Sequence, residues 1–236
     1  LFRSDVQSIR LDREVPNIHS RLAMTYKITM PKDDDPATSF AVDSRQQVKN
    51  ADAKAKSFEL TVTAIRSPAK LEKPADPPGK EFLGNSFFIN WENDAVKAHA
   101  AKAVSQLPPT ASAWDKGRAI ERWVKENMKA VEFSQAMATA DNVAKTLSGD
   151  CTEYAMLSAA MCRAAGVPSR TALGLVYVPS SDGGKPFLAY HMWFEVFVDG
   201  QWLGLDATLG QGGVGPGHVK ITDHSWNDEQ IGRAHV

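Results

Sequence analysis

The 236-residue chain has only two cysteines, no long apolar run and almost no net charge. A membrane helix needs about 20 apolar residues, but the most apolar stretch, residues 155–167, is shorter and contains Arg163. We therefore expect no membrane span. A formal net charge of −1 gives no bulk attraction to nucleic acid or to an anionic membrane, so a nucleic-acid partner is not expected.

Cys151 and Cys162, the two cysteines, lie eleven positions apart within one predicted helix. At a rise of about 1.5 Å per residue their Cα atoms are roughly 16 Å apart, whereas a disulfide requires about 7 Å or less. The two thiols therefore do not bridge while the helix is intact. Cys162 is predicted to be a small buried core residue.

Sequence signals for a cofactor or a metal are also missing. His218 and His224 have no metal-ligand partners at suitable spacing, so we expect structural or surface roles for them. The glycine-rich run 210–217 contains neither a G-x-G-x-x-G that opens a helix nor a Gly-Lys-Ser/Thr, and we predict a flexible loop there. No cofactor-binding residue and no metal ligand is predicted.

The pattern of apolar residues changes near Trp91. Before it, residues 21–30 and 58–64 alternate apolar and polar side chains, as half-buried strands do, and we assign residues 1–90 to a β-rich N-terminal domain or segment. After it, helices are predicted at 94–106, 115–128 and 151–165, followed by strands at 170–178, 190–198 and 201–207. This order predicts an α+β fold for residues 91–236.

Cys151 stands at the start of the third predicted helix, directly after the sequence S-G-D. Ser148 and Asp150 are both candidate caps for this helix, and Gly166, with Pro168 two positions later, ends it. The N-terminal end of a helix stabilises a thiolate through its dipole and its unpaired N–H groups. Gly149 leaves room for a substrate carbonyl, and the N–H of Cys151 is a natural oxyanion donor.

The Asp-Gly pair at 199–200 separates two strand-like runs and predicts a two-residue hairpin. The resulting register puts His191 and Asp206 on one sheet face as diagonal neighbours, about 7–8 Å apart at the backbone and within reach of a hydrogen bond. A shift of one residue would separate them. We predict that the opposite face is the buried one, because it carries Met192, Phe194, Val196, Leu203 and Leu205.

A cysteine nucleophile needs a base to take its proton and a third group to orient that base. Cys151, His191 and Asp206 supply these three groups in chain order. We therefore predict a catalytic triad. Glu195 lies on the face of His191, two positions beyond Trp193, and is predicted to form a structural ion pair or to be solvated rather than to act in catalysis.

Four segments resemble the transglutaminase-like superfamily of papain-type thiol enzymes: G-D-C-T-E-Y-A-M-L, R-A-A-G-V-P-S-R, H-M-W-F-E-V and W-L-G-L-D-A-T, in this order within residues 91–226. The resemblance implies Cys151 as the nucleophile, His191 as base and acid, and Asp206 as the residue that orients His191. It also implies a papain-like core, with the cysteine-bearing helix packed on an antiparallel sheet. A β-rich segment ahead of such a core is similar to the architecture of bacterial members, several of them exported.

The resemblance has two gaps. Many family members supply a second oxyanion donor from a Trp or Gln upstream of the nucleophile. Trp114, Trp123 and Gln135 lie upstream here, and Trp123 is assigned to core packing because it belongs to an apolar helical stripe. The calcium dependence of animal transglutaminases is not implied, because the chain has no Asp-x-Asp-x-Asp-Gly loop.

These observations predict a thiol-dependent hydrolase or acyl-transferase that acts on amide bonds of peptides or proteins through a thioester. Water as the acceptor would define a peptidase or amidase, and a lysine amine would define a crosslinking enzyme. A peptidoglycan stem peptide is a third substrate option. The alternative is a peptide- or protein-binding module of the same fold in an envelope assembly, with the N-terminal β region as its contact surface. We expect an exported or periplasmic location.

Overall fold

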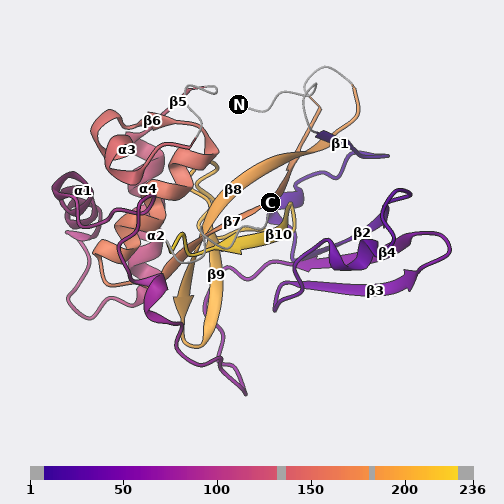
Figure 1. The fold of residues 1–236 in the computed structure, drawn as a ribbon, viewed down its shortest axis with the longest axis horizontal. Helices are drawn as coiled ribbons and strands as arrows, with labels where there is room; N and C mark the ends of the chain where they lie inside the picture. Colours follow the sequence, from indigo (N-terminus) through magenta and orange to yellow (C-terminus); the bar gives the residue numbers. More distant parts are fainter. Residues whose placement is uncertain (1–7, 132–136, 181–183, 228–236) are drawn as a thin grey trace.

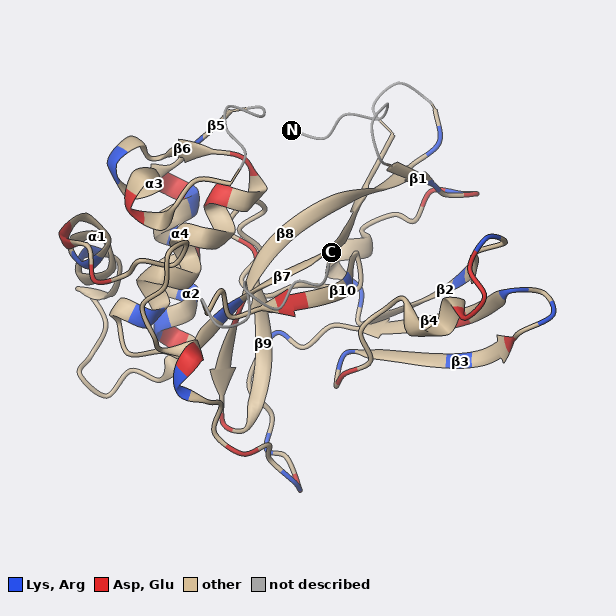
Figure 2. Ribbon diagram, viewed as in Figure 1, with Lys and Arg blue, Asp and Glu red and all other residues tan. Residues whose placement is uncertain are grey.

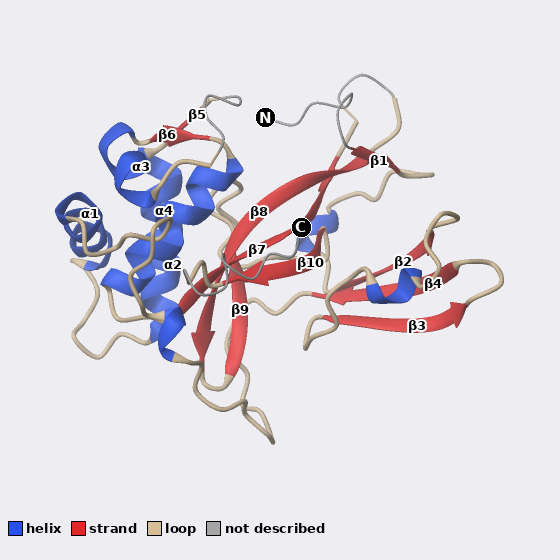
Figure 3. Ribbon diagram, viewed as in Figure 1, coloured by secondary structure: helices blue, strands red, loops and turns tan. Residues whose placement is uncertain are grey.

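The chain folds into three layers in the computed structural model, which describes residues 8–131, 137–180 and 184–227. Four helices pack on one side of a central antiparallel sheet, and a small second sheet lies on the other side (Figure 1). The α-helices gather at one side of the molecule, and the longer strands lie outside that region (Figure 3). Within the described residues, no helix combines the length and the apolar character needed to cross a membrane.

The helical layer surrounds one buried helix. Its members are α1 (Asp94–Val104), α2 (Ala113–Asn127), α3 (Ala140–Thr146) and α4 (Cys151–Ala164). Every residue of α4 from 153 to 163 is buried, as expected for a helix that is apolar on all sides and packed within a domain. It contacts the other three helices and strands β7 and β8. The predictions for α1, α2 and α4 are confirmed to within two residues, but α3 was not predicted.

The central sheet has the strand order β1-β8-β7-β10, with β9 also paired to β8. Its strands are β1 (Ser8–Arg10), β7 (Ser169–Val178), β8 (Phe187–Val198), β9 (Gln201–Leu205) and β10 (His218–His224). Asp199 and Gly200 have φ angles of 49° and 79°, the left-handed values of a type I′ turn. The predicted register is confirmed, because Val198 pairs with Gln201 and Phe194 with Leu205.

Both faces of the long strand β8 are buried. Met192, Phe194 and Val196 pack against the helices, as predicted. The other face, with His191, Trp193 and Glu195, was not expected to be covered, yet these three side chains are 1–2% exposed. Trp193 fits there because its partner across β7 is the small residue Ala172, and the two pack with Val214.

The second sheet contains β2 (Ala23–Thr29), β3 (Gln46–Asp52) and β4 (Ser57–Thr63) in the order β2-β4-β3. The predictions of β2 and β4 are confirmed, while β3 was not predicted. Phe58, Leu60 and Val62 of β4 belong to the same apolar cluster as Leu175 of β7 and Val219 of β10. The N-terminal region therefore shares a core with the central sheet, and its assignment as a domain of residues 1–90 stays a prediction.

Two short strands, β5 (Lys129–Ala130) and β6 (Ser148–Gly149), pair in parallel just before α4. Three single turns of 3-10 helix complete the described elements: η1 (Ile18–Ser20), η2 (Pro36–Thr38) and η3 (Lys80–Phe82). Basic and acidic residues are interspersed over the helices and the small sheet (Figure 2), in keeping with the net charge of −1.

Candidate active site

Cys151 is the first residue of α4, and its position is fixed by a capping box. The side chain of Asp150 accepts a hydrogen bond from the N–H of Thr152 at 2.9 Å, and Glu153 accepts from the N–H of Asp150 at 3.0 Å. This arrangement satisfies backbone donors at the start of the helix. The predicted cap by Asp150 is confirmed. Cys151 is partly exposed and carries a free thiol.

Gly149 precedes the cap at a point where a side chain does not fit. A Cβ atom at this position would lie 2.3 Å from Cβ of Glu153 and 2.6 Å from its Cγ. The carboxylate of Glu153 also accepts a hydrogen bond from the N–H of Ala138. Gly149 therefore lets Glu153 fold back over the start of α4 and complete the capping box.

His191 lies in the middle of β8, opposite Gly174 of β7. Its Nε2–H donates to Oδ2 of Asp206 at 2.8 Å, so the predicted diagonal contact is present. Burial opposes a charge on the ring, but the charge and hydrogen bond of Asp206, together with the neighbouring Cys151 thiol, outweigh burial and raise the pKa of His191 to about 10. The ring is therefore an imidazolium at neutral pH.

Asp206 follows β9 and accepts hydrogen bonds through both carboxylate oxygens. Oδ1 accepts from the N–H of Thr208 at 2.8 Å and from the N–H of Leu209 at 3.4 Å. Although burial opposes the carboxylate charge, the two neighbouring histidines hold the pKa of Asp206 well below its usual range. Asp206 is therefore ionised across the whole range of physiological pH.

Glu121 of α2 is a further member of the site that sequence reasoning missed. Its Oε1 accepts hydrogen bonds from the N–H of Asp206 and the N–H of Gly212, each at 3.2 Å. Burial raises the pKa of Glu121 to about 7. This side chain ties the segment that carries Asp206 to the helical layer.

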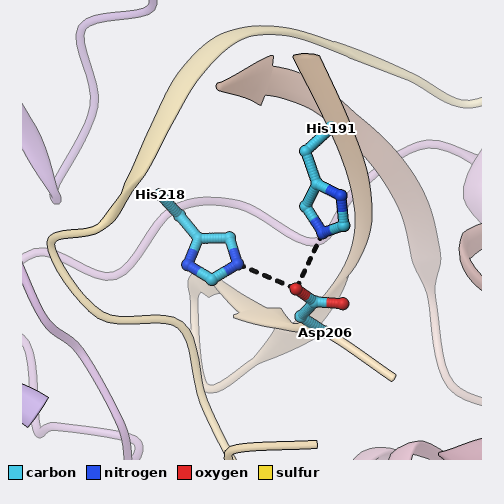
Figure 4. A group of neighbouring side chains, drawn as sticks. All are labelled: His191, Asp206 and His218. Carbon is cyan, nitrogen blue, oxygen red and sulfur yellow. Dashed lines mark hydrogen bonds and ion pairs between the residues drawn. The ribbon is translucent and has the colours of Figure 1, made fainter. Parts of the chain in front are cut away.

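His218 is the second missed residue. It opens β10, is fully buried, and donates through Nε2–H to Oδ2 of Asp206 at 2.9 Å. Figure 4 shows both imidazole rings pointing at this one carboxylate from different strands. Burial lowers the pKa of His218 to about 4 against the opposing pull of Asp206, so His218 is neutral when His191 is charged. The expectation of a structural or surface role did not include this contact.

The same three residues, His191, Asp206 and His218, form one potential metal-ligand cluster within the described part of the chain, with ligand atoms within 4.8 Å of one another. A tetrahedral zinc ion about 2.1 Å from each ligand would separate neighbouring ligand atoms by roughly 3.4 Å. Here each Nε2 lies 2.8 or 2.9 Å from the same oxygen, which is an ordinary hydrogen-bond distance. We interpret the cluster as a hydrogen-bonded group.

Glu195 belongs to a buried ion network beside the site. Its carboxylate lies 2.7 Å from a guanidinium nitrogen of Arg170 and 2.8 Å from Nζ of Lys220. Burial opposes its charge, but these two cations hold the pKa of Glu195 below its usual value. The prediction of a structural ion pair is confirmed.

The three sequence candidates for a second oxyanion donor lie in different surroundings. Trp114 is buried on α2 within the main core. Trp123 lies against His99 with the two rings tilted and their centroids 4.7 Å apart, and it packs against the same core, as predicted. Gln135 lies outside the described residues.

The glycine-rich run 210–217 lies beside the site but is mostly buried. A Cβ atom at Gly215 would lie 2.2 Å from the carbonyl oxygen of His19, and one at Gly217 would lie 2.6 Å from the ring of His19. The glycines therefore allow close packing against the N-terminal region.

Cys162 is also buried and free, as predicted, and burial raises the pKa of its thiol.

The sequence and the fold were compared with those of known proteins. Residues 98–207 match the family model described as the transglutaminase-like superfamily. A candidate cysteine protease from Cytophaga hutchinsonii superposes with a TM-score of 0.56 at 18% identity, over 88% of this chain and 78% of that chain. The periplasmic domain of TgpA from Pseudomonas aeruginosa gives 0.53 at 16% identity, over 86% and 81%. No curated protein matches the sequence. The predicted α+β core is confirmed.

Proposed function

We propose that the chain, whose residues 98–207 match the family model of the transglutaminase-like superfamily, is a thiol-dependent hydrolase or acyl-transferase that acts on amide bonds of peptides or proteins. Cys151 is the nucleophile, His191 is the general base and acid, and Asp206 orients His191. The observation that carries this proposal is the position of the His191 ring, which donates to Asp206 through Nε2 and lies near enough to Cys151 for the thiol to raise its pKa.

The first half of the reaction forms a thioester. The sulfur of Cys151, as a thiolate paired with the His191 imidazolium, attacks the carbonyl carbon of the amide. The N–H of Cys151 lies in the first turn of α4, where an N–H has no intrahelical partner, and it holds the oxyanion. His191 then gives its proton to the leaving amine, the carbon–nitrogen bond breaks, and the acyl group stays on sulfur.

The second half transfers the acyl group to an acceptor. His191, now neutral, takes a proton from water or from an amine, and the acceptor attacks the thioester carbon. The carbon–sulfur bond breaks and Cys151 leaves as the thiolate, which restores the ion pair. Asp206 stays ionised throughout, because two donors share its Oδ2. Water as the acceptor gives hydrolysis, and an amine gives transamidation.

We also propose that the protein acts outside the cytoplasm on peptide or protein substrates. One structural neighbour, the TgpA domain, is described as periplasmic. The proposal is tested by fractionating the native host and locating the chain with an antibody. Recovery in the cytoplasmic fraction alone would overturn it.

A matched set of assays tests the activity. Wild type, Cys151→Ala, His191→Ala and Asp206→Asn are incubated with a panel of amide substrates, and separately with a glutamine peptide and a labelled amine donor. Amide cleavage or amine incorporation that is lost in Cys151→Ala supports the proposal, and the ratio of the two products distinguishes hydrolysis from transfer. Activity retained in Cys151→Ala would refute it. Tight peptide binding without turnover would instead support the alternative, a binding module.

A further inference from the structure

We propose that His218 is a positioning residue for this reaction: it fixes the carboxylate of Asp206 so that His191 can pair with the thiol of Cys151. The inference rests on the proposed function and extends it to a fourth residue. The observation behind it is that one oxygen atom, Oδ2 of Asp206, accepts hydrogen bonds from both His191, at 2.8 Å, and His218, at 2.9 Å.

The four hydrogen bonds around Asp206 explain why His218 matters for orientation. Oδ1 is held by the backbone N–H groups of Thr208 and Leu209. Oδ2 faces the two rings, and His218 takes the lone pair that His191 leaves free. Without His218, Oδ2 would have a single partner and the carboxylate could twist away from His191. A catalytic group needs this kind of support from its neighbours to hold a productive geometry.

The neutral state of His218 suits this task. A charged ring would compete with His191 for the carboxylate, whereas a neutral ring with its proton on Nε2 donates one directed hydrogen bond. The ring centroids of His191 and His218 are 5.8 Å apart. A second positive charge at that distance in a buried site is disfavoured. The positive charge therefore stays on His191, next to Cys151.

The N-terminal region holds His218 in place. A guanidinium nitrogen of the buried Arg45 donates to the carbonyl oxygens of Gly215 and His218, at 3.0 and 3.3 Å. The hydroxyl of Tyr26 donates to the carbonyl oxygen of Pro216 at 2.8 Å. The ring of His19 meets that of His218 edge-on, with centroids 5.5 Å apart. These contacts restrict movement of His218 away from Asp206.

The test uses iodoacetamide, which alkylates thiolates, across a pH series. His218→Met keeps the length of the side chain but removes the donor, while the amide of His218→Gln can still donate to Asp206. At about pH 6 we expect His218→Met to be alkylated at Cys151 about 10- to 100-fold more slowly than wild type, the factor that a charged hydrogen bond supports. His218→Gln should remain within about threefold. Above about pH 9 all rates should converge, because a free thiol ionises unaided there.

His224→Gln is the matched control, because His224 is an exposed residue at the other end of the same strand, and it should behave like wild type. Near-UV circular dichroism identifies variants that fold. If His218→Met does not fold, His218→Asn replaces it, since the shorter amide does not reach Asp206.

Four outcomes are decisive. Slow alkylation near pH 6 that is restored by glutamine establishes the positioning role. Rates equal to wild type in His218→Met, while His191→Ala loses the reaction near pH 6, would overturn this inference and leave the proposed function standing. A uniform decrease at every pH without rescue by glutamine would indicate structural support alone and would also overturn it. If His191→Ala reacts like wild type, both proposals fail.

Discussion

Replacing Asp206 by asparagine should move the titration of His191 by several pH units. The carboxylate receives four N–H donors: those of His191, His218, Thr208 and Leu209. An asparagine amide offers one oxygen and places its own N–H₂ against some of these donors. At least one buried donor then loses its partner, at a cost of about 1–3 kcal/mol in unfolding free energy.

The larger effect concerns the charge on His191. Asp206 is the main cause that raises the pKa of His191 to about 10, against burial, which acts in the opposite direction. In Asp206→Asn burial dominates, and we expect a pKa below the reference value of about 6.5. The change of at least about 3.5 units corresponds to roughly 5 kcal/mol of lost stabilisation of the imidazolium.

The measurement is NMR of protein labelled with ¹⁵N-histidine, titrated from about pH 4 to about pH 11. The His191 signal is identified from its absence in His191→Gln. Asp199→Asn is the control, because Asp199 is exposed in the adjoining hairpin turn and has a φ angle of 49°, which asparagine tolerates. A His191 midpoint in Asp206→Asn within about one unit of wild type would refute the reasoning.

Three further changes have defined outcomes. Burial raises the pKa of Glu121 to about 7, so the folded state binds this proton more tightly than the unfolded state, and stability falls as pH rises from about 4.5 to about 7. Glu121→Gln should remove that decline and, in urea unfolding at about pH 8, be more stable than wild type by up to about 3 kcal/mol. An unchanged pH dependence of stability would contradict the assignment. Gly149→Ala would put a Cβ atom 2.3 Å from that of Glu153. We expect the free energy of unfolding to fall by about 1–3 kcal/mol and the alkylation of Cys151 to become slower. Neither change should occur if the capping box does not position the thiol. Lys220→Met leaves the buried Glu195 with Arg170 as its remaining partner. This variant should lose about 3 kcal/mol in unfolding free energy. A loss below about 1 kcal/mol would mean that the Glu195–Lys220 pair is not buried in solution.

Local signals in the sequence were sufficient to predict much of the site. The capping residue Asp150 and the apolar helix after it fixed the place of Cys151. The Asp199–Gly200 turn fixed the register of β8 and β9, and this register alone put His191 near Asp206. Both inferences depend on neighbours in the chain, where helix caps and hairpin turns have strong residue preferences.

The rest of the site depends on contacts between distant segments. Glu121 lies 85 positions before Asp206, and its role appears only when α2 packs against β9. From the sequence, the polar residues His218 and Lys220 of β10 would be expected to face solvent. Hydropathy does not show that each of them has a buried acidic partner. For the same reason the burial of the His191 face of β8 could not be predicted.

The most direct test of the account is the reaction of Cys151 with iodoacetamide at about pH 6 in wild type and in His191→Ala. If His191 is an imidazolium paired with the thiolate, wild type should react much faster than His191→Ala, and the modified peptide should contain Cys151 rather than the buried Cys162. Equal rates of labelling in the two proteins would contradict the central claim that the thiol, the imidazole and the carboxylate act together.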